Sequence, residues 1–314
     1  GGRRGAMHQA LRADDVYQIF LPLCHVVGLS WSFFPALWAG ATVVLQPRFS
    51  ASRYWPVALE HGTTVGSQVI FSAKVLAQHP APQHRIRQWI DALCREEVES
   101  HFGVRALGAW GMTEMVSQGI VGDPWSPQRN GSIGRPSPAY DIKLVDDEGK
   151  PIQPGETGNL LVKGIPGLSI FAEYFNDPAA TEAAFDDNGY FKTGDRLTLH
   201  EDGFISFSER ARDLIKVGGE GVAPAEVERV IGEVAGVREV AVVAKPDPNY
   251  SEVVAAFVVT GGGEDPALRE RIVAHCTKSL AKFKVPREVI FIDELPRISI
   301  GKVAKVKLRE RWKT

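Results

Sequence analysis

The chain has 314 residues, which is enough for one large domain or two ordinary ones. Its hydrophobic fraction of 44%, charged fraction of 24% and formal net charge of -2 are those of an ordinary globular protein. Proteins that bind nucleic acid usually carry a basic patch or stripe, so this composition argues against a nucleic-acid partner. No apolar run approaches the ~20 residues of a membrane-spanning helix.

The three cysteines, Cys24, Cys94 and Cys276, are far apart and odd in number. They predict neither a disulfide framework nor a metal cluster, and we expect buried, reduced thiols in a cytoplasmic protein. The chain starts at Gly1 without a signal-peptide pattern. We therefore expect these residues to be part of a longer gene product.

The first part of the chain predicts a parallel α/β lobe. Residues 16–21 and 42–45 are short apolar runs typical of buried strands. Residues 28–38 are apolar nearly all round, as in a buried helix. Buried strands that alternate with helices favour a sheet covered on both faces.

Residues 131–208 change character and predict an antiparallel, barrel-like subregion. They are rich in Gly and Pro, and polar turns separate short alternating runs at 141–145, 158–163, 197–200 and 204–207. Such runs joined by short polar turns indicate β-hairpins.

The last hundred residues predict a small α+β domain. Pro224 and Pro266 can each begin a helix, and both are followed by apolar residues at helical spacing. Residues 237–243, 253–259 and 289–292 are typical of strands. We place the boundary near residues 210–213, so the expected domains are 1–211, the C-terminal portion of a large α/β domain, and 212–314, a small and mobile one.

Two short segments carry candidate chemistry in the first domain. In Trp110–Glu114, Gly111 permits a tight turn. The hydroxyl of Thr113 can bind a phosphate oxygen, and the carboxylate of Glu114 can bind Mg²⁺. On its own the segment is better explained as a helix N-terminus. In 190–195, Asp195 could accept hydrogen bonds from a ribose diol, although an aspartate in a solvated turn is the commoner case.

Two further segments lie at and beyond the boundary. Residues 210–220 combine a basic cluster with a glycine pair, and arginine suits bidentate contact with phosphate. A charged linker explains this segment about as well. In residues 295–302, Lys302 follows a glycine and could reach an anionic ligand as a mobile charge, although a surface lysine is the simpler interpretation.

Taken in this order, the four segments resemble the adenylate-forming superfamily, which includes acyl-CoA synthetases, luciferases and the adenylation domains of peptide synthetases. The pattern is Gly-Met-Thr-Glu, Thr-Gly-Asp, Arg-x-Arg-Asp-x-Ile-Lys-x-Gly-Gly-Glu and Pro-x-x-x-x-Gly-Lys. Residues 21–28, 131–136 and 155–158 match further landmarks of this superfamily. The resemblance covers nearly the whole chain and favours the functional interpretation of the separate segments.

The resemblance implies an ATP-dependent carboxylic acid–CoA ligase. In that superfamily a carboxylate attacks the α-phosphorus of ATP to give acyl-AMP and pyrophosphate, and a thiol, usually of CoA, then displaces AMP. Implied roles are contact with the α-phosphate for Thr113 and Mg²⁺ binding for Glu114. Asp195 would hold the ribose with help from Arg210, and Lys302 would bridge the carboxylate and the α-phosphate. Trp110 and Gly111 would border the nucleotide, with Trp110 near adenine.

The resemblance also implies that the small domain rotates between the two half-reactions. Arg212 stands at the pivot, where Asp or Lys is more common. Lys216, Gly218 and Gly219 would then line the thiol channel. The acyl pocket is expected beside His25, Gly108 and Ala109, where the two small residues would leave room for the acid. A buried structural role for His25 remains an alternative.

The phosphate loop of the superfamily, a Ser/Thr/Gly-rich segment ending in Pro-Lys-Gly, is not found before residue 13. The segment at 87–94 also departs from the Gly-Ala-rich adenine loop that many members have. Two alternatives to a CoA ligase therefore stay open: a catalytically incomplete fragment, and an adenylation domain that loads a carrier protein. The expected ligands are ATP, Mg²⁺, CoA and a carboxylic acid of unspecified class, and a homodimeric assembly is left open.

Overall fold

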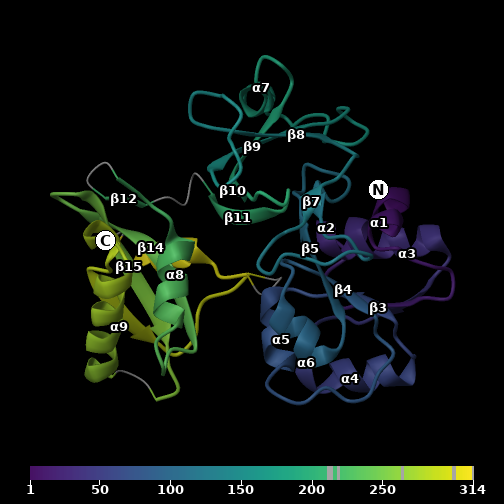
Figure 1. Cartoon of the computed structure of the whole chain (residues 1–314), viewed down its shortest axis with the longest axis horizontal. Helices are drawn as coiled ribbons and strands as arrows, with labels where there is room; N and C mark the ends of the chain where they lie inside the picture. Colours follow the sequence, from purple (N-terminus) through teal and green to yellow (C-terminus); the bar gives the residue numbers. More distant parts are fainter. Residues whose placement is uncertain (211–214, 218–219, 263–264, 299–301, 313–314) are drawn as a thin grey trace. The chain divides into compact units, whose positions relative to one another are not determined.

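The computed structural model describes residues 1–210, 215–217, 220–262, 265–298 and 302–312, with the side chains of residues 209, 210, 216 and 220 outside the description. The chain divides into two compact units, Gly1–Phe207 and Ser208–Thr314 (Figure 1). Each unit has its own hydrophobic core and is described by itself. No helix among the described residues is long and apolar enough to cross a membrane.

The first unit contains a seven-stranded sheet of order β2-β1-β3-β4-β5-β6-β7. The five strands from β2 to β5 in this order are parallel, whereas β6 and β7 run antiparallel to their neighbours. Buried apolar side chains dominate the central strands, as expected for a parallel sheet. The strands are β1 (Val16–Ile19), β2 (Thr42–Leu45), β3 (Val65–Ser67), β4 (Gln88–Asp91), β5 (Arg105–Trp110), β6 (Ile120–Val121) and β7 (Arg135–Pro136).

Helices cover both faces of this sheet. Figure 1 shows α1 and α3 on one face, and α4, α5 and α6 on the other. The helical segments are α1 (Gly2–His8), α2 (Val26–Gly28), the π-helix η1 (Leu29–Phe33), α3 (Phe34–Ala39), α4 (Ala51–Glu60), α5 (Ile70–Leu76) and α6 (Glu96–Phe102). This arrangement confirms the predicted α/β lobe.

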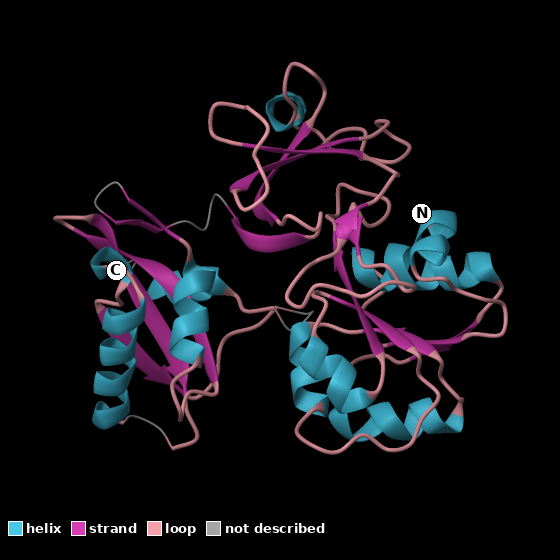
Figure 2. Cartoon of the chain, in the orientation of Figure 1, coloured by secondary structure: helices cyan, strands magenta, loops and turns pink. Residues whose placement is uncertain are grey.

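A four-stranded sheet of order β11-β10-β9-β8 completes the first unit (Figure 2). Its strands are β8 (Asp141–Val145), β9 (Thr157–Lys163), β10 (Phe191–Leu199) and β11 (Ile205–Arg210), and α7 (Pro178–Ala184) lies between β9 and β10 in sequence. β9 pairs antiparallel with β8 and β10, so the predicted antiparallel subregion is present.

The second unit is a five-stranded sheet with helices. Its strands are β12 (Ile215–Val217), β13 (Glu220–Val222), β14 (Glu239–Asp247), β15 (Ser251–Val259) and β16 (Glu288–Ile292). The helices are α8 (Pro224–Gly232), α9 (Pro266–Ser279), α10 (Lys305–Arg309) and the short 3₁₀ turns η3 (Lys282–Lys284) and η4 (Glu310–Trp312). Pro224 and Pro266 both occupy the first helical turn, as predicted.

Two local predictions need correction. The apolar segment 28–38 is helical but only partly buried, because Leu37 and Trp38 are each 64% exposed. Of the three cysteines, Cys94 and Cys276 are buried but Cys24 is exposed. In both cases the residue type suggests burial, but only the fold shows which of these side chains are covered by other residues.

Candidate active site

The Trp110–Glu114 segment leaves the carboxyl end of β5, the last parallel strand of the sheet. The chain then turns back, and the Gly119 N–H donates to the Trp110 carbonyl at 2.9 Å before β6 begins. Ligand sites in open α/β sheets lie outside the carboxyl ends of the strands. The sequence-predicted segment therefore occupies the edge of the sheet where such a site is expected.

Trp110 contacts the second sequence-predicted segment directly. Its indole Nε1–H donates to Asp195 Oδ2 at 2.8 Å, across 85 positions of sequence. Both side chains are buried, at 6% and 1% exposure. The structure thus brings two separately predicted site residues together, and it gives Trp110 an anchoring contact that the sequence did not indicate.

Asp195 owes its position to an irregularity in β10. The pairing of β10 with β9 shifts register between Lys192 and Arg196, and Gly194 takes a left-handed φ of 72° there. The Thr193 hydroxyl donates to the Leu160 carbonyl at 2.8 Å and accepts from the Asp195 N–H at 3.1 Å. The bulge re-aims the Asp195 carboxylate toward Trp110.

Glu114 is held by a partner that sequence reasoning missed. The Tyr174 hydroxyl donates to Glu114 Oε1 at 2.9 Å. Burial, and then the hydrogen bond to the Glu114 carboxylate, raise the pKa of Tyr174 to about 12, so this phenol keeps its proton at neutral pH. The signal available in the sequence was the aromatic run that includes Phe171, Tyr174 and Phe175.

The backbone fixes the same pair of segments. The Phe171 N–H donates to the Glu114 carbonyl at 2.7 Å, and the Val116 N–H donates to the Ser169 carbonyl at 3.1 Å. Glu114 is half-buried and Thr113 is exposed. Among the described residues, Tyr174 binds Oε1 of Glu114, and Oε2 is left for a cation. Mg²⁺ commonly binds one or two protein carboxylates and keeps several waters, so a single oxygen of Glu114 suits this ion. In that described part, no group of three or more His, Cys, Asp or Glu side chains is placed so that it could hold a metal ion.

Gly111 is required for a reason other than the predicted tight turn. A Cβ at this position would lie 2.6 Å from Cζ2 of the buried Trp31, so a side chain would collide with the indole. Gly111 is not among the glycines with positive φ. The glycine therefore allows Trp31, which belongs to η1, to pack against the loop.

The predicted acyl-pocket residues occupy different surroundings. His25 is half-exposed and caps α2, because its Nδ1 accepts from the Val27 N–H at 3.3 Å. Ala109 is buried in a cluster with Trp31, Ile90 and Leu107. At Gly108 a Cβ would lie 2.6 Å from the Ser132 carbonyl oxygen and 2.8 Å from the Cys94 backbone nitrogen, so neighbouring backbone fills that side of Gly108.

The segment that could not be aligned from sequence borders the same edge. Asp91 pairs with Gly108 in the β4–β5 register. Arg95 Nε donates to Asp91 Oδ2 at 3.0 Å, and both side chains are buried. Burial raises the pKa of Asp91, while Arg95 acts in the opposite direction. This buried pair fixes the loop after β4 beside the Trp110 segment, and the sequence analysis did not identify it.

The remaining site residues belong to the second unit or to its junction. Arg210 ends β11 and Lys216 lies in β12, opposite Gly221 of β13, but both side chains are outside the description. Arg212, Gly218 and Gly219 lie outside the described residues. The Lys302 side chain is exposed, and its carbonyl accepts from the Ile298 N–H at 2.9 Å, next to the Arg297–Val303 bridge.

Comparison with known proteins places this geometry in a family. Residues 3–175 match the AMP-binding enzyme family, and residues 226–302 match the C-terminal domain of AMP-binding enzymes. The crotonobetaine/carnitine–CoA ligase of Proteus mirabilis is 36% identical over 318 residues, which cover 98% of this chain and 61% of that ligase. The chain thus spans about three fifths of the length of the curated relatives that it matches.

Solved structures agree with this assignment. ATP-bound MatB from Rhodopseudomonas palustris superposes with a TM-score of 0.90 at 29% identity, over 99% of this chain and 63% of MatB. O-succinylbenzoate coenzyme A synthetase from Bacillus subtilis, in complex with AMP, gives a TM-score of 0.83 at 31% identity, over 100% of this chain and 63% of that enzyme. The chain belongs to the AMP-binding enzyme family.

Proposed function

We propose that this chain forms part of an ATP-dependent carboxylic acid–CoA ligase that works through an acyl-AMP intermediate. The observation that carries the proposal is the buried hydrogen bond from Trp110 to Asp195, because it joins the candidate nucleotide loop to the candidate ribose-binding carboxylate. The relatives support the choice of reaction, since several are CoA ligases for different acids.

In the first half-reaction an acid carboxylate oxygen attacks the α-phosphorus of ATP, and pyrophosphate leaves. Asp195 accepts hydrogen bonds from the ribose hydroxyls, while the Thr113 hydroxyl donates to an α-phosphate oxygen. Glu114, oriented by Tyr174, contributes a ligand to Mg²⁺. When bound, that ion neutralises phosphate charge. Lys302 stabilises the negative charge that develops as the acid attacks.

In the second half-reaction a thiolate attacks the acyl carbon and AMP leaves. Lys216, Gly218 and Gly219 are proposed to line the path of the thiol, with Arg212 as the pivot between the two arrangements. The division of the chain at residues 207 and 208 supports a junction close to this pivot. The proposed domains remain 1–211 and 212–314, and the proposed location is cytoplasmic.

The test is release of AMP and pyrophosphate from ATP, Mg²⁺ and CoA with a panel of acids. The relatives suggest crotonobetaine, carnitine, benzoate, anthranilate and O-succinylbenzoate as the panel. We expect pyrophosphate with one acid class in the absence of CoA, and a thioester only when CoA is added. A carrier-protein acceptor would be shown by acyl transfer to a phosphopantetheine protein but not to CoA.

A catalytically incomplete fragment is the second candidate, and the coverage of 61% of the curated relatives favours it. In that case the 314-residue chain binds AMP but forms no pyrophosphate with any acid, whereas a longer gene product does both. Calorimetry with AMP separates this outcome from an incorrect assignment of the nucleotide site. A chain in which Asp195 does not bind ribose would bind no AMP.

A further inference from the structure

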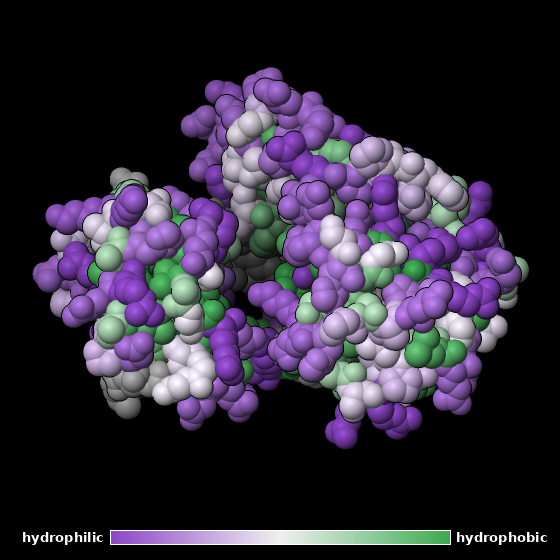
Figure 3. Space-filling view, turned by 60° about the horizontal axis from the view of Figure 1, so that its bottom comes forward, coloured by the Kyte–Doolittle hydropathy of each residue, from purple (hydrophilic) through white to green (hydrophobic). Residues whose placement is uncertain are grey.

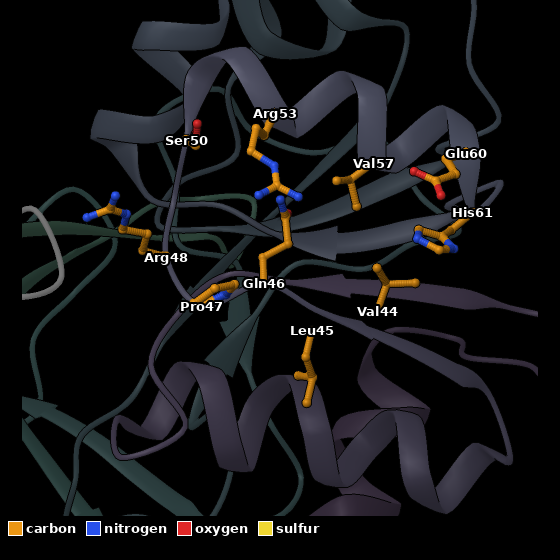
Figure 4. A pocket seen from close by; sticks show the side chains of 10 residues that line it. All are labelled: Val44, Leu45, Gln46, Pro47, Arg48, Ser50, Arg53, Val57, Glu60 and His61. Atoms are coloured by element: carbon orange, nitrogen blue, oxygen red, sulfur yellow. The ribbon is translucent and has the colours of Figure 1, made fainter.

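Charged side chains are common on the surface of the molecule, but most of them lie far from the candidate site segments. Hydrophilic residues cover most of the face shown in Figure 3, and ion pairs exposed in this way contribute little to stability because water screens them. Charged residues also border the hollow of about 440 Å³ beside β2, whose lining residues belong to no candidate segment (Figure 4). An ion pair that is partly buried and joined to a site segment occurs in the second unit.

Lys302 lies on one of two short segments that pair with each other. The Ile298 N–H donates to the Lys302 carbonyl at 2.9 Å, and the Ala304 N–H donates to the Pro296 carbonyl at 2.7 Å. These hydrogen bonds hold the two segments together, but they do not attach them to the sheet of the unit. We call these paired segments the lysine arms; they are residues 295–298 and 302–304.

Apolar side chains attach the lysine arms to one face of the sheet. Leu295 is buried at 4% exposure, and Val303 is partly buried against the same apolar cluster. The cluster includes Ala241 and Val243 of β14. Apolar contacts have no preferred direction, so they keep the arms on the sheet without setting where the exposed Lys302 points.

An ion pair gives the lysine arms a defined direction. Arg297 Nη2 donates to Glu239 Oε1 at 2.5 Å, and the two side chains are 25% and 34% exposed. Glu239 begins β14 and alternates with Ala241 and Val243, so it lies on the face of the sheet that carries the apolar cluster. β14 pairs with β15 along its whole length, which makes it a rigid support. Hydrogen bonds between a guanidinium and a carboxylate are strong and directional, so this pair orients the first arm.

We propose that the Arg297–Glu239 ion pair positions Lys302 for the adenylation step. The inference rests on the proposed function, in which Lys302 stabilises charge at the α-phosphate. A lysine is a point charge on a flexible four-carbon stem, so the place of its backbone decides how readily the ammonium reaches its target. A misplacement of about 1 Å can slow a reaction about 100-fold. Arg297 and Glu239 touch no reacting atom in this scheme and act through Lys302.

Hydrogen exchange at single amides tests the positioning without catalysis. In Glu239→Ala we expect the Ile298 and Ala304 amides to exchange about tenfold faster, because the arms separate from the sheet and from each other more often. The Arg238 N–H donates to the Val259 carbonyl at 2.9 Å next to the substitution and should exchange as before. Unchanged exchange at Ile298 and Ala304 would overturn the proposal, since the pair would then not hold the arms.

Acid-dependent ATP–pyrophosphate exchange measures the catalytic consequence. Glu239→Ala should lower kcat about tenfold and leave the apparent KM values for ATP and the acid within about twofold, because Lys302 acts on charge that develops in the transition state. Thioester formation from supplied acyl-AMP should stay normal. Glu288→Ala is the matched control, since Glu288 accepts a hydrogen bond from Lys245 of β14 at 2.7 Å with similar exposure, outside the lysine arms. It should alter neither reaction.

Two combined variants separate positioning from general support of the fold. In the Lys302→Ala background, Glu239→Ala should lower pyrophosphate exchange no further, because it acts through that lysine. The double variant Glu239→Arg, Arg297→Glu should recover most of the lost exchange, because the ion pair can form again with its charges reversed. A further loss in the Lys302→Ala background, or equal loss of both half-reactions in Glu239→Ala, would overturn the proposal.

The amide measurement also distinguishes failure of this inference from failure of the proposed function. If the wild-type chain forms no pyrophosphate with any acid, the proposed reaction fails for this chain, and the amides alone decide the role of the ion pair. Faster exchange at Ile298 and Ala304 in Glu239→Ala, but not in Glu288→Ala, then supports the positioning of Lys302. Equal exchange in both variants overturns it.

Discussion

The indole of Trp110 donates a hydrogen bond of 2.8 Å to the carboxylate of Asp195, and both side chains are buried. A buried carboxylate that has no hydrogen-bond donor is unfavourable, because it has also lost its contacts with water. The hydrogen bond from Trp110 therefore stabilises Asp195 in its buried position. It also links the end of β5 to the bulge in β10. Two of our predictions concern the groups that position the acidic residues of the site.

Trp110→Phe tests the contact with Asp195. The phenyl ring keeps much of the packing but removes the donor, so we expect the free energy of unfolding to fall by about 1–3 kcal/mol. AMP should bind about tenfold more weakly, because Asp195, the carboxylate proposed to bind the ribose, is no longer oriented. Calorimetry with AMP and urea unfolding measure the two effects. Trp125→Phe, at a position 81% exposed, is the control, and equal AMP affinity in both variants would contradict the prediction.

Tyr174→Phe tests the support of Glu114. Loss of a residue that orients a metal ligand typically weakens metal binding 10- to 100-fold, so the Mg²⁺ concentration for half-maximal activity should rise by about tenfold. Because the pKa of Tyr174 is about 12, the effect should be constant between about pH 6 and 9. Tyr250→Phe provides the comparison. A shift in apparent acid affinity at unchanged Mg²⁺ dependence would assign Tyr174 to the substrate instead.

The candidate segments are identified by their resemblance to the adenylate-forming superfamily, and the structure brings two of them together through Trp110 and Asp195. The sequence could not predict the contact of Tyr174 with Glu114, since this contact joins segments that are 60 positions apart in sequence. Asp91 and Arg95 are only four residues apart, but their burial as a pair depends on how the sheet covers the loop after β4. The sequence also could not predict the packing of Trp31 against Gly111. A sequence shows that a side chain is missing, but only the fold shows that Trp31 fills the space.

Gly111→Ala tests that packing. The added Cβ would lie 2.6 Å from Trp31 Cζ2, and overpacking of this kind costs about 1–3 kcal/mol. Trp31→Leu alone should also destabilise the chain, because it removes a buried aromatic side chain. The double variant Gly111→Ala, Trp31→Leu should be more stable than the sum of the single effects predicts. Urea unfolding of all four proteins measures the coupling, and strictly additive costs would show that the indole is not the obstacle.

Asp15 gives a prediction for acid stability. Burial acts to raise its pKa, but hydrogen bonds from Arg87, Thr64 and the Arg12 N–H outweigh burial and lower it. A carboxyl group with a lowered pKa in the folded state stabilises the fold above its unfolded pKa, and this stabilisation is lost as the pH falls through the folded pKa. We therefore expect stability to decline from about pH 4 downward.

Asp15→Asn should cost about 1.5–3 kcal/mol at neutral pH, because it removes the charged acceptor of the Arg87 hydrogen bonds. The difference between the two proteins should shrink below about pH 4, where the wild-type carboxyl also becomes neutral. Urea unfolding at several pH values measures this. If the difference in the free energy of unfolding stayed constant below about pH 4, the destabilisation would come from altered packing and not from the lost charge.

Lys302→Ala separates the two half-reactions. The Ile298–Lys302 hydrogen bond and the Arg297–Val303 bridge hold the backbone at this lysine, and its side chain is exposed. If Lys302 stabilises charge at the α-phosphate, the variant should lose acid-dependent ATP–pyrophosphate exchange by ~10²-fold or more and still form thioester from supplied acyl-AMP.

Lys305→Ala is the matched control for Lys302→Ala, because Lys305 Nζ lies 2.6 Å from Glu228 Oε1 within the same unit. Removing it should leave exchange unchanged at a small cost in stability. Lys216→Ala should show the opposite bias, with normal exchange and slow thioester formation. Equal loss of both steps in Lys302→Ala would remove it from the adenylation step, because a residue that only supports the fold impairs both half-reactions together.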